Sequence, residues 1–271
     1  MQKYYTRVCN FYYGEISKKL IKEKKTLPLH GDKKISFDQI EILSRNSKKK
    51  IHIKQIKNLS NFLKKKINQD LKKITKKKKN FSCFYFDKIP NIMGILNLTP
   101  DSFSDGGKFN KKNIGYRHAK NLHKLGASII DVGGESTRPG SKNIQIKDEW
   151  NRIKFTLKKL NNKIPLSLDT RKAEIMEKGI NEGVKLINDI SGLNFDKGTI
   201  KILKKYNVPF VIHHIQGAPA NMQNNPKYKN VLLDIYDFFE ERLNFVRKSG
   251  IQNNKIIIDP GIGFGKNLKH N

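Results

Sequence analysis

The 271 residues carry a formal net charge of +31 and 37% hydrophobic side chains, which is typical of a globular protein with one sizeable core and a basic surface. No apolar run reaches about 18 residues and the first residues lack the apolar centre of a signal peptide, which excludes a membrane span and favours the cytoplasm. Cys9 and Cys83 stand far apart, which argues against a disulfide framework and against a zinc site.

The positive charge is concentrated in the first third of the chain. Residues 1–90 contain 25 Lys and Arg against 7 Asp and Glu, whereas the remaining residues contain 30 against 17. Clustered lysine favours nucleic-acid binding because it neutralises phosphates. Lysine is abundant throughout this chain, however, which is more typical of a compositional bias and a solvated surface. We therefore do not expect nucleic acid as a partner, although a basic RNA- or DNA-binding protein built on this extension stays open as a hypothesis.

Residues 1–88 are expected to form an N-terminal extension that is small and α+β, or partly disordered. Segments 6–13 and 34–43 alternate in part between apolar and polar residues, as half-buried strands do. Residues 58–79 predict a lysine-rich helix, because apolar side chains recur at spacings of three and four. These side chains are Leu59, Phe62, Leu63, Ile67, Leu71 and Ile74. The lysine run at 76–79 is expected to act as a linker.

From residue 89 to residue 271, strand-like and helix-like segments alternate. Short apolar runs predict strands at 92–97, 128–132, 165–169, 185–189, 208–213 and 255–259. The clearest helices between them are expected at 113–125, 147–160, 172–182 and 231–249. This alternation is typical of an α/β protein with a parallel sheet.

Two glycine-rich blocks include the first two of these strands. The first runs from Ile92 to Gly107 and the second from Gly126 to Gly140, and each leads from an apolar strand into a polar loop. Side chains and backbone N–H groups at the carboxyl ends of parallel strands converge on a ligand. Both blocks, in this order, resemble the dihydropteroate synthase family. The resemblance continues through Ser167-Leu-Asp-Thr170, Ile187-Asn-Asp-Ile190, His214-Ile-Gln-Gly-Ala-Pro-Ala-Asn-Met-Gln223 and Asp259-Pro-Gly-Ile-Gly-Phe-Gly-Lys-Asn267.

The resemblance implies a fold and a reaction. The fold is a TIM (β/α)8 barrel, but only about six β/α units are present here, where a closed barrel needs eight. The reaction belongs to folate biosynthesis and is the target of sulfonamides. In it, 4-aminobenzoate displaces diphosphate from (7,8-dihydropterin-6-yl)methyl diphosphate and forms 7,8-dihydropteroate. The site must therefore hold a pterin, stabilise a leaving diphosphate and place an aromatic amine beside an electrophilic carbon.

Three polar residues are candidates for binding the pterin. Its guanidine-like edge, with an amino group and a ring N–H, pairs well with a carboxylate and an amide, and Asp259 and Asn188 supply these groups at the ends of predicted strands. The resemblance places Asp169 against the reduced ring, where its charge favours a cationic intermediate. The alternative, that an Asp at a strand end only caps the next helix, stays open for Asp169.

The diphosphate needs cations and N–H donors. Asn97 is similar to the family residue that reaches Mg²⁺ on the diphosphate, and Mg²⁺ typically keeps several waters and substrate oxygens as its other ligands. Thr137 and Arg138 offer a hydroxyl and a fixed-charge guanidinium to phosphate oxygens, and we expect them to act in catalysis together with Asp169.

The loops Thr99–Gly107 and Glu135–Ser141 are rich in Gly, Pro and Ser, and we predict that they are mobile lids that exclude water. In the family these loops help to form the aminobenzoate site, which makes Pro139 and Phe103 candidate ring contacts. Phe264 is a further candidate, and any of the three can instead be a packing residue.

Two motifs invite other interpretations. The segment Gly261–Lys266 resembles a nucleotide-binding loop but lacks the Walker spacing. The pair His213-His214 suggests a metal site, yet adjacent residues of a strand face opposite ways. His213 occupies a place where the family commonly has a Met under the pterin ring, and Ile262 stands where Phe is common.

Family members have two further strands that this sequence does not contain. We therefore expect an incomplete gene product with exposed sheet edges and little or no turnover, and one alternative is an inactive fragment that retains partial pterin binding. Another is a pterin- or folate-binding methyltransferase-like domain, against which the two glycine-rich blocks argue. The family also suggests a homodimer formed through barrel helices.

Overall fold

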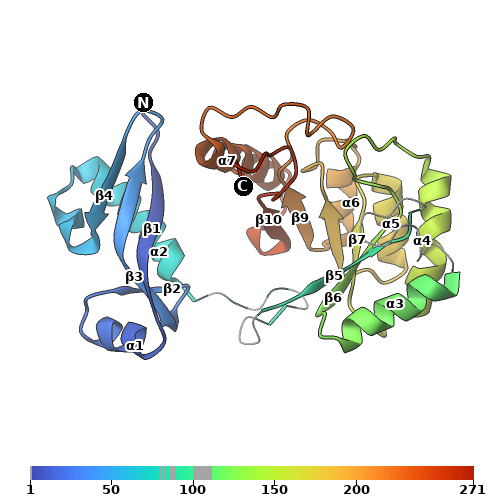
Figure 1. Cartoon of the computed structure of the whole chain (residues 1–271), viewed down its shortest axis with the longest axis horizontal. Coiled ribbons are helices and arrows are strands. Elements are labelled where there is room, and N and C mark those ends of the chain that lie inside the picture. The colour runs from blue at the N-terminus through green and yellow to red at the C-terminus, as the bar shows by residue number, and fades with distance from the viewer. Residues whose placement is uncertain (1, 78, 80, 82–83, 86–89, 100–111) are drawn as a thin grey trace. The chain divides into compact units, whose positions relative to one another are not determined.

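The computed structural model describes residues 2–77, 79, 81, 84–85, 90–99 and 112–271, except for the side chain of residue 112. The chain divides into two compact units, Met1–Lys79 and Asn80–Asn271, each with its own hydrophobic core (Figure 1). The sequence suggests a boundary at residue 88, and residues 86–89 lie outside the described part of the chain.

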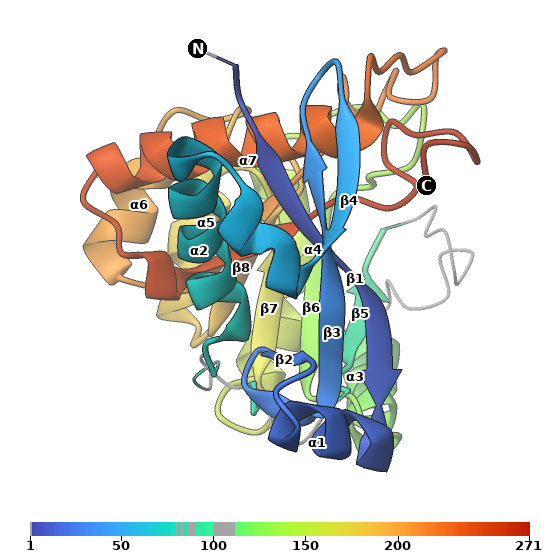
Figure 2. The same cartoon turned by 90° about the vertical axis from the view of Figure 1, so that its left-hand side faces the viewer.

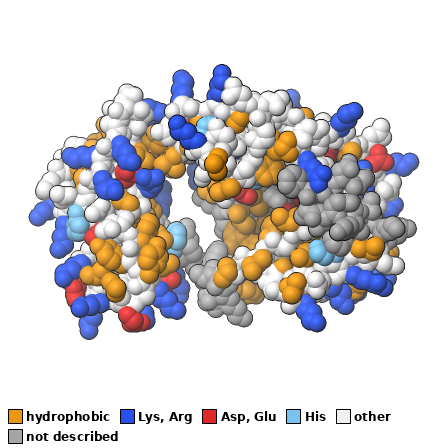
Figure 3. Space-filling view, in the orientation of Figure 1, with side chains coloured by type: hydrophobic (Ala, Val, Ile, Leu, Met, Phe, Trp, Pro, Cys, Tyr) orange, Lys and Arg blue, Asp and Glu red, His pale blue; other side chains and the backbone are white. Residues whose placement is uncertain are grey.

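The first unit is an antiparallel sheet with two α-helices. Its long central strand β3 pairs with β1 along one edge and with β2 and β4 along the other, and Figure 2 shows β1 and β3 running side by side. Lys and Arg side chains are spread over much of its surface in Figure 3. In chain order the elements are β1 (Tyr5–Tyr13), α1 (Gly14–Lys22), β2 (Leu27–Leu29), β3 (Asp32–Leu43), β4 (Lys48–His52), the 3-10 helix η1 (Ile53–Asn58) and α2 (Asn61–Thr75).

The core of this unit confirms the helical pattern seen in the sequence, with one exception. Ile67 and Leu71 of α2 are buried against Phe37 and Ile40 of β3, as expected for apolar residues on one face of a helix. Phe62 instead remains 54% exposed, although its ring lies edge-on to that of Tyr4 at a centroid distance of 6.3 Å. The predicted helix ends at Thr75, and α1, β2 and β4 were not predicted from the sequence.

The second unit is a six-stranded parallel sheet whose order is β10-β9-β8-β7-β6-β5, so each strand lies beside its neighbour in the sequence. Helices α3 to α7 connect the strands (Figure 1). The elements are β5 (Met93–Asn97), α3 (Lys112–Lys124), β6 (Ile129–Gly133), α4 (Ile146–Leu160), β7 (Leu166–Asp169), α5 (Ala173–Asn181), β8 (Leu186–Asp189), α6 (Thr199–Tyr206), β9 (Phe210–His213), α7 (Val231–Lys248), the 3-10 helix η2 (Asn253–Lys255) and β10 (Ile256–Asp259).

All six predicted strands are confirmed, each with a start one or two residues later than the sequence suggested. The four predicted helices are confirmed within one residue at each end, while the eight-residue α6 was not among them. In α4, Asp148 and Glu149 lie in the first turn and Lys158 and Lys159 in the last, an arrangement that complements the helix dipole.

The two faces of this sheet differ in what they pack against. Alternate residues such as Val132, Leu168 and Ile187 face the helices and belong to the main hydrophobic cluster. Ile129 and Leu186 face the other way and form a second, smaller cluster. Among the described strands β5 and β10 are the edges of the sheet, as the count of six units implied. None of the described helices has both the length and the apolar character needed to cross a membrane.

Candidate active site

A row of polar side chains follows the carboxyl ends of the parallel strands. In the strand register Asn97 pairs with Gly133, Gly133 with Asp169, and Asp169 with Asn188. On the far side of the sheet's centre, Asp259 of β10 pairs with His213 of β9.

The face on which these side chains lie follows from the period of two in a strand. Three residues that precede these positions by an even number of residues belong to the cluster that faces away from the helices. They are Ile129 before Gly133 in β6, Leu186 before Asn188 in β8, and Val211 before His213 in β9. Asn188 and His213 therefore project from that same face. The sheet thus brings Asn97, Asp169, Asn188, His213 and Asp259 to one end of one face. A pocket shared by Asp169, Asn188 and Asp259 stays a prediction.

Gly133 allows two members of the row to approach closely. A Cβ atom on this residue would lie 3.3 Å from the Oδ1 atom of Asn97 and 3.3 Å from the Oδ2 atom of Asp169. A side chain here would crowd both oxygens, so the glycine leaves space between an amide oxygen and a carboxylate oxygen. The amide oxygen of Asn97 is a hard ligand of the kind that a magnesium ion takes beside substrate oxygens and water.

Burial dominates the electrostatics of this row. It raises the pKa of Asp169 well above its ordinary value, and the nearby charge of Asp131 raises it further. Asp131 is itself only 5% exposed and accepts a hydrogen bond of 2.9 Å from the Nδ2 atom of Asn188. The sequence analysis did not identify Asp131, although its position two residues before Gly133 puts it on the same face of β6.

His213 and the loop after β10 form one side of the site. The rings of His213 and Phe264 meet edge to face at a centroid distance of 4.6 Å, which places Phe264 beside the row. Its assignment as a contact of the aminobenzoate ring stays a prediction. Asp259 accepts a hydrogen bond of 2.8 Å from the backbone N–H of Gly261 through Oδ1. Its other carboxylate oxygen has no role in that turn and can serve a ligand.

The side chain of Lys266 stabilises this loop through hydrogen bonds to its backbone. Its Nζ atom donates to the carbonyl oxygens of Gly261 and Phe264 at 2.9 and 3.0 Å and lies 2.9 Å from Nδ1 of His214. Burial lowers the pKa of Lys266 to about 8 and that of His214 to about 4. A neutral His214 therefore accepts the third hydrogen bond, and the lysine is directed into its own loop, unlike the phosphate-binding lysine of a nucleotide loop.

The two histidines face opposite ways, as expected. His214 packs on Phe238 at a centroid distance of 4.9 Å, whereas His213 lies beside Phe264. Within the described parts of the chain there is no cluster of His, Cys, Asp and Glu that could hold a metal ion by itself.

A buried ion network anchors the loop that contains Thr137 and Arg138. Glu135 accepts from Arg171 Nε and from Lys172 Nζ, both at 2.9 Å, and Lys172 also donates to Glu149 at 2.6 Å. Burial alone would raise the pKa of Glu135, but the hydrogen bonds from Arg171 and Lys172 outweigh it and lower the value. The sequence did not predict this network, because its members come from three separate segments of the chain.

The network holds the second glycine-rich loop next to Asp169. A small cavity there is lined by Thr137 and Asp169 together with Glu135, Thr170, Arg171 and Ile190. Arg138 is half-buried in the same loop, and Pro139 beside it is exposed. The structure therefore brings Thr137 to Asp169 and leaves Pro139 at the surface.

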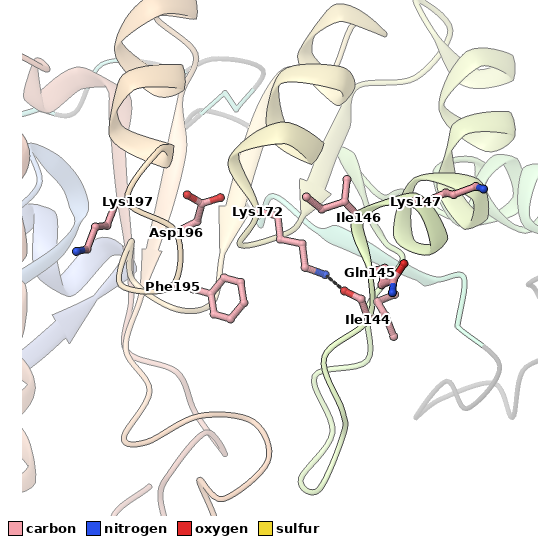
Figure 4. Close-up of a pocket in the computed structure, with 8 residues that line it drawn as sticks. All are labelled: Ile144, Gln145, Ile146, Lys147, Lys172, Phe195, Asp196 and Lys197. Carbon is pink, nitrogen blue, oxygen red and sulfur yellow. Dashed lines mark hydrogen bonds between the residues drawn. The ribbon is translucent and has the colours of Figure 1, made fainter.

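A larger, shallow pocket of about 690 Å³ lies on the outer side of the network (Figure 4). Figure 4 shows the Lys172 side chain directed toward the carbonyl oxygen of Ile144, which accepts from it at 2.8 Å. The pocket is lined by Ile144, Gln145, Ile146, Lys147, Lys172, Phe195, Asp196 and Lys197. It includes no member of the polar row and is a separate feature.

Part of the first predicted lid is outside the described residues. Phe103 falls there, as do residues 100–107 of the loop Thr99–Gly107, while Thr99 itself is buried. The assignment of Phe103 as a ring contact therefore stays a prediction.

Residues 93–271 match the family described as "Pterin binding enzyme", so the chain belongs to that family of pterin-binding enzymes. Its relatives there are dihydropteroate synthases, as the motifs suggested. The enzyme of Clostridium beijerinckii is 45% identical over 182 residues, which are 66% of this chain and 65% of that protein.

Two solved structures extend the comparison. The Yersinia pestis dihydropteroate synthase with a sulfonamide drug is 42% identical, with a TM-score of 0.65, over 67% of this chain and 66% of its own. The Burkholderia cenocepacia enzyme complexed with 7,8-dihydropteroate is 34% identical, with a TM-score of 0.59, over 68% and 62%. The predicted α/β fold of the TIM-barrel family is thereby confirmed, and the chain spans about two thirds of the length of these relatives.

Proposed function

We propose that this chain has the function of its dihydropteroate synthase relatives, in which the pterinylmethyl group of (7,8-dihydropterin-6-yl)methyl diphosphate is transferred to 4-aminobenzoate. The observation that most supports the proposal is the row formed by Asp169, Asn188 and Asp259, because a carboxylate, an amide and a second carboxylate share one end of one sheet face. These groups complement the N–H donors on the edge of a dihydropterin and the positive charge that develops on its reduced ring as the diphosphate leaves.

The diphosphate would lie between Asn97 and the second loop. Thr137 offers a hydroxyl donor and Arg138 a guanidinium, and the buried network at Glu135 fixes the loop from which both project. The Asn97 amide oxygen, held near Asp169 by the absence of a side chain at Gly133, fits as a protein ligand for Mg²⁺. Such an ion would neutralise charge on the departing diphosphate.

The carbon left by the diphosphate becomes electron-poor and is attacked by the amine of 4-aminobenzoate. An ionised Asp169 beside the ring would stabilise the developing positive charge. Burial and the charge of Asp131 raise the pKa of Asp169 and so favour its neutral form in the ligand-free protein. A positive charge that develops on the ring beside it would favour the ionised form instead. Phe264 and Pro139, together with Phe103, are the proposed contacts of the aminobenzoate ring, and His213 would lie beneath the pterin.

The test is the appearance of 7,8-dihydropteroate when the full chain is incubated with both substrates and Mg²⁺, measured by chromatography. We expect only slow product formation, because the described sheet has six strands where a closed barrel needs eight, and we expect it to require 4-aminobenzoate. Asp169→Asn should lower this rate by roughly 100-fold or more, a typical size for removing one group that stabilises charge in a transition state. If wild-type chain forms no product, the proposed turnover is wrong. A methyltransferase-like domain would bind the pterin but show no dependence on the diphosphate group.

We also propose, on the basis of the family alone, that the chain forms a homodimer through barrel helices. Sedimentation equilibrium of the full chain at micromolar concentration tests this proposal. A mass near twice 31.3 kDa supports it, and a monomer at all concentrations overturns it.

A further inference from the structure

Asp131 is a buried carboxylate for which the proposed reaction has no use. It lies on β6, one layer deeper in the sheet than Gly133, and is 5% exposed. Its Oδ2 atom accepts a hydrogen bond of 2.9 Å from Nδ2 of Asn188, two strands away. This hydrogen bond therefore connects the Asn188 amide, which is proposed to bind the pterin, to the carboxyl group of Asp131 deeper in the sheet.

An ionised carboxylate can only accept hydrogen bonds, whereas an amide can rotate to present either its NH₂ group or its oxygen. In this structure Oδ2 of Asp131 is the acceptor, and the Asn188 amide turns Nδ2 toward β6 to donate to it. The opposite atom, Oδ1 of Asn188, is shielded from solvent and has no hydrogen-bond partner among the described residues. An acceptor buried in this way costs free energy until a donor reaches it, which points to a ligand N–H.

We propose that Asp131 is a positioning residue that fixes the orientation of the Asn188 amide and so selects a pterin over its 2,4-dioxo analogue, a lumazine. The inference rests on the proposed pterin-binding function. A pterin presents a 2-amino donor beside the N1 acceptor, whereas a lumazine presents a carbonyl beside an N–H. In the orientation held by Asp131, Oδ1 of Asn188 can accept from the 2-amino group of a pterin while the second Nδ2 hydrogen is donated to N1. The rotated amide would instead pair with the carbonyl and the N–H of a lumazine.

Asp131→Asn tests the inference with an isosteric side chain that can accept or donate, so that Asn188 is free to turn either way. The probes are 6-hydroxymethylpterin and 6-hydroxymethyllumazine, titrated calorimetrically into the full chain. Wild type should bind the pterin tighter by roughly tenfold or more, as expected when one buried polar group is left unpaired. In Asp131→Asn the two ligands should bind within about threefold of each other.

Asp189→Asn is the matched control, because it makes the same chemical change on the neighbouring residue of β8, where the side chain bonds to Ser191 instead of Asn188. Its preference should equal that of wild type. If Asp131→Asn does not fold, Asp131→Ser removes the same constraint. An unchanged preference in a folded Asp131 variant overturns the inference while leaving pterin binding intact, and failure of wild type to bind the pterin removes both.

Discussion

Lys172 is the residue on which the second loop most depends. Its Nζ atom contacts Glu135, Glu149 and the carbonyl oxygen of Ile144 within 2.9 Å, and the side chain is 7% exposed. Lys172→Met would leave two buried carboxylates without their shared cation. We expect the free energy of unfolding to fall by about 3–5 kcal/mol, measured by urea denaturation at pH 7.

Lys178→Met is the control for this substitution. Lys178 also contacts a carboxylate, that of Glu174 at 2.6 Å, but the side chains are 38% and 54% exposed. An exposed pair one helical turn apart contributes about 0.3–0.5 kcal/mol. Equal losses of stability in the two variants would contradict the view that Lys172 matters because of its burial.

The ionisation of Asp189 makes the stability of the second unit depend on pH. Burial raises its pKa to about 6 from the ordinary 3.8, although Ser191 donates two hydrogen bonds to it. The folded state therefore binds the proton more tightly than the unfolded state, and stability rises as the pH falls from about 6 to about 4. For this group the gain is about 3 kcal/mol, since one pKa unit corresponds to about 1.4 kcal/mol.

Asp189→Asn should abolish this contribution. In urea denaturation between pH 4 and 7, wild type should gain about 3 kcal/mol relative to the variant as the pH falls. Parallel stability curves for the two proteins would show that Asp189 titrates normally in the fold.

Site residues that end an apolar strand within a motif could be predicted from the sequence. Residues that act through partners distant in the sequence could not. Asp169, Asn188 and Asp259 each end an apolar run, so sequence placed them together. Asp131 sits within a strand, and Lys172 meets Glu135 and Glu149 only after folding, so neither has a local signal.

At the scale of elements, the end of β6 packs very closely on α4. A Cβ atom on Gly134 would lie 2.8 Å from the backbone oxygen of Glu149 and 2.9 Å from Cγ2 of Ile153. Backbone cannot yield as a side-chain end can, so Gly134→Ala must separate the strand end from the helix. We expect a loss of about 1–3 kcal/mol in unfolding free energy by urea denaturation, the usual cost of overpacking. A variant as stable as wild type would show that this contact adjusts freely.

The six strands and four of the helices were predictable because each has an apolar pattern of the right period and length. The eight-residue α6 is too short to show a clear helical period, and β2 has only three residues. In the first unit, β4 begins with three lysines, and its place in the sheet follows from pairing with β3 instead of its own sequence.

At the scale of the whole molecule, the chain has two separate hydrophobic cores, and the polar row belongs to the second alone. We therefore propose that the parallel sheet of Asn80–Asn271 recognises the pterin at the carboxyl ends of its strands.

Calorimetric titration of the full chain with (7,8-dihydropterin-6-yl)methyl diphosphate and Mg²⁺ tests this assignment most directly, beside Asp259→Asn and the exposed-site control Asp148→Asn. The account predicts one ligand per chain, binding weakened by about tenfold or more in Asp259→Asn, where a charge-assisted hydrogen bond is lost, and unchanged affinity in the control. No binding by wild type, or equal affinity in all three proteins, would contradict it.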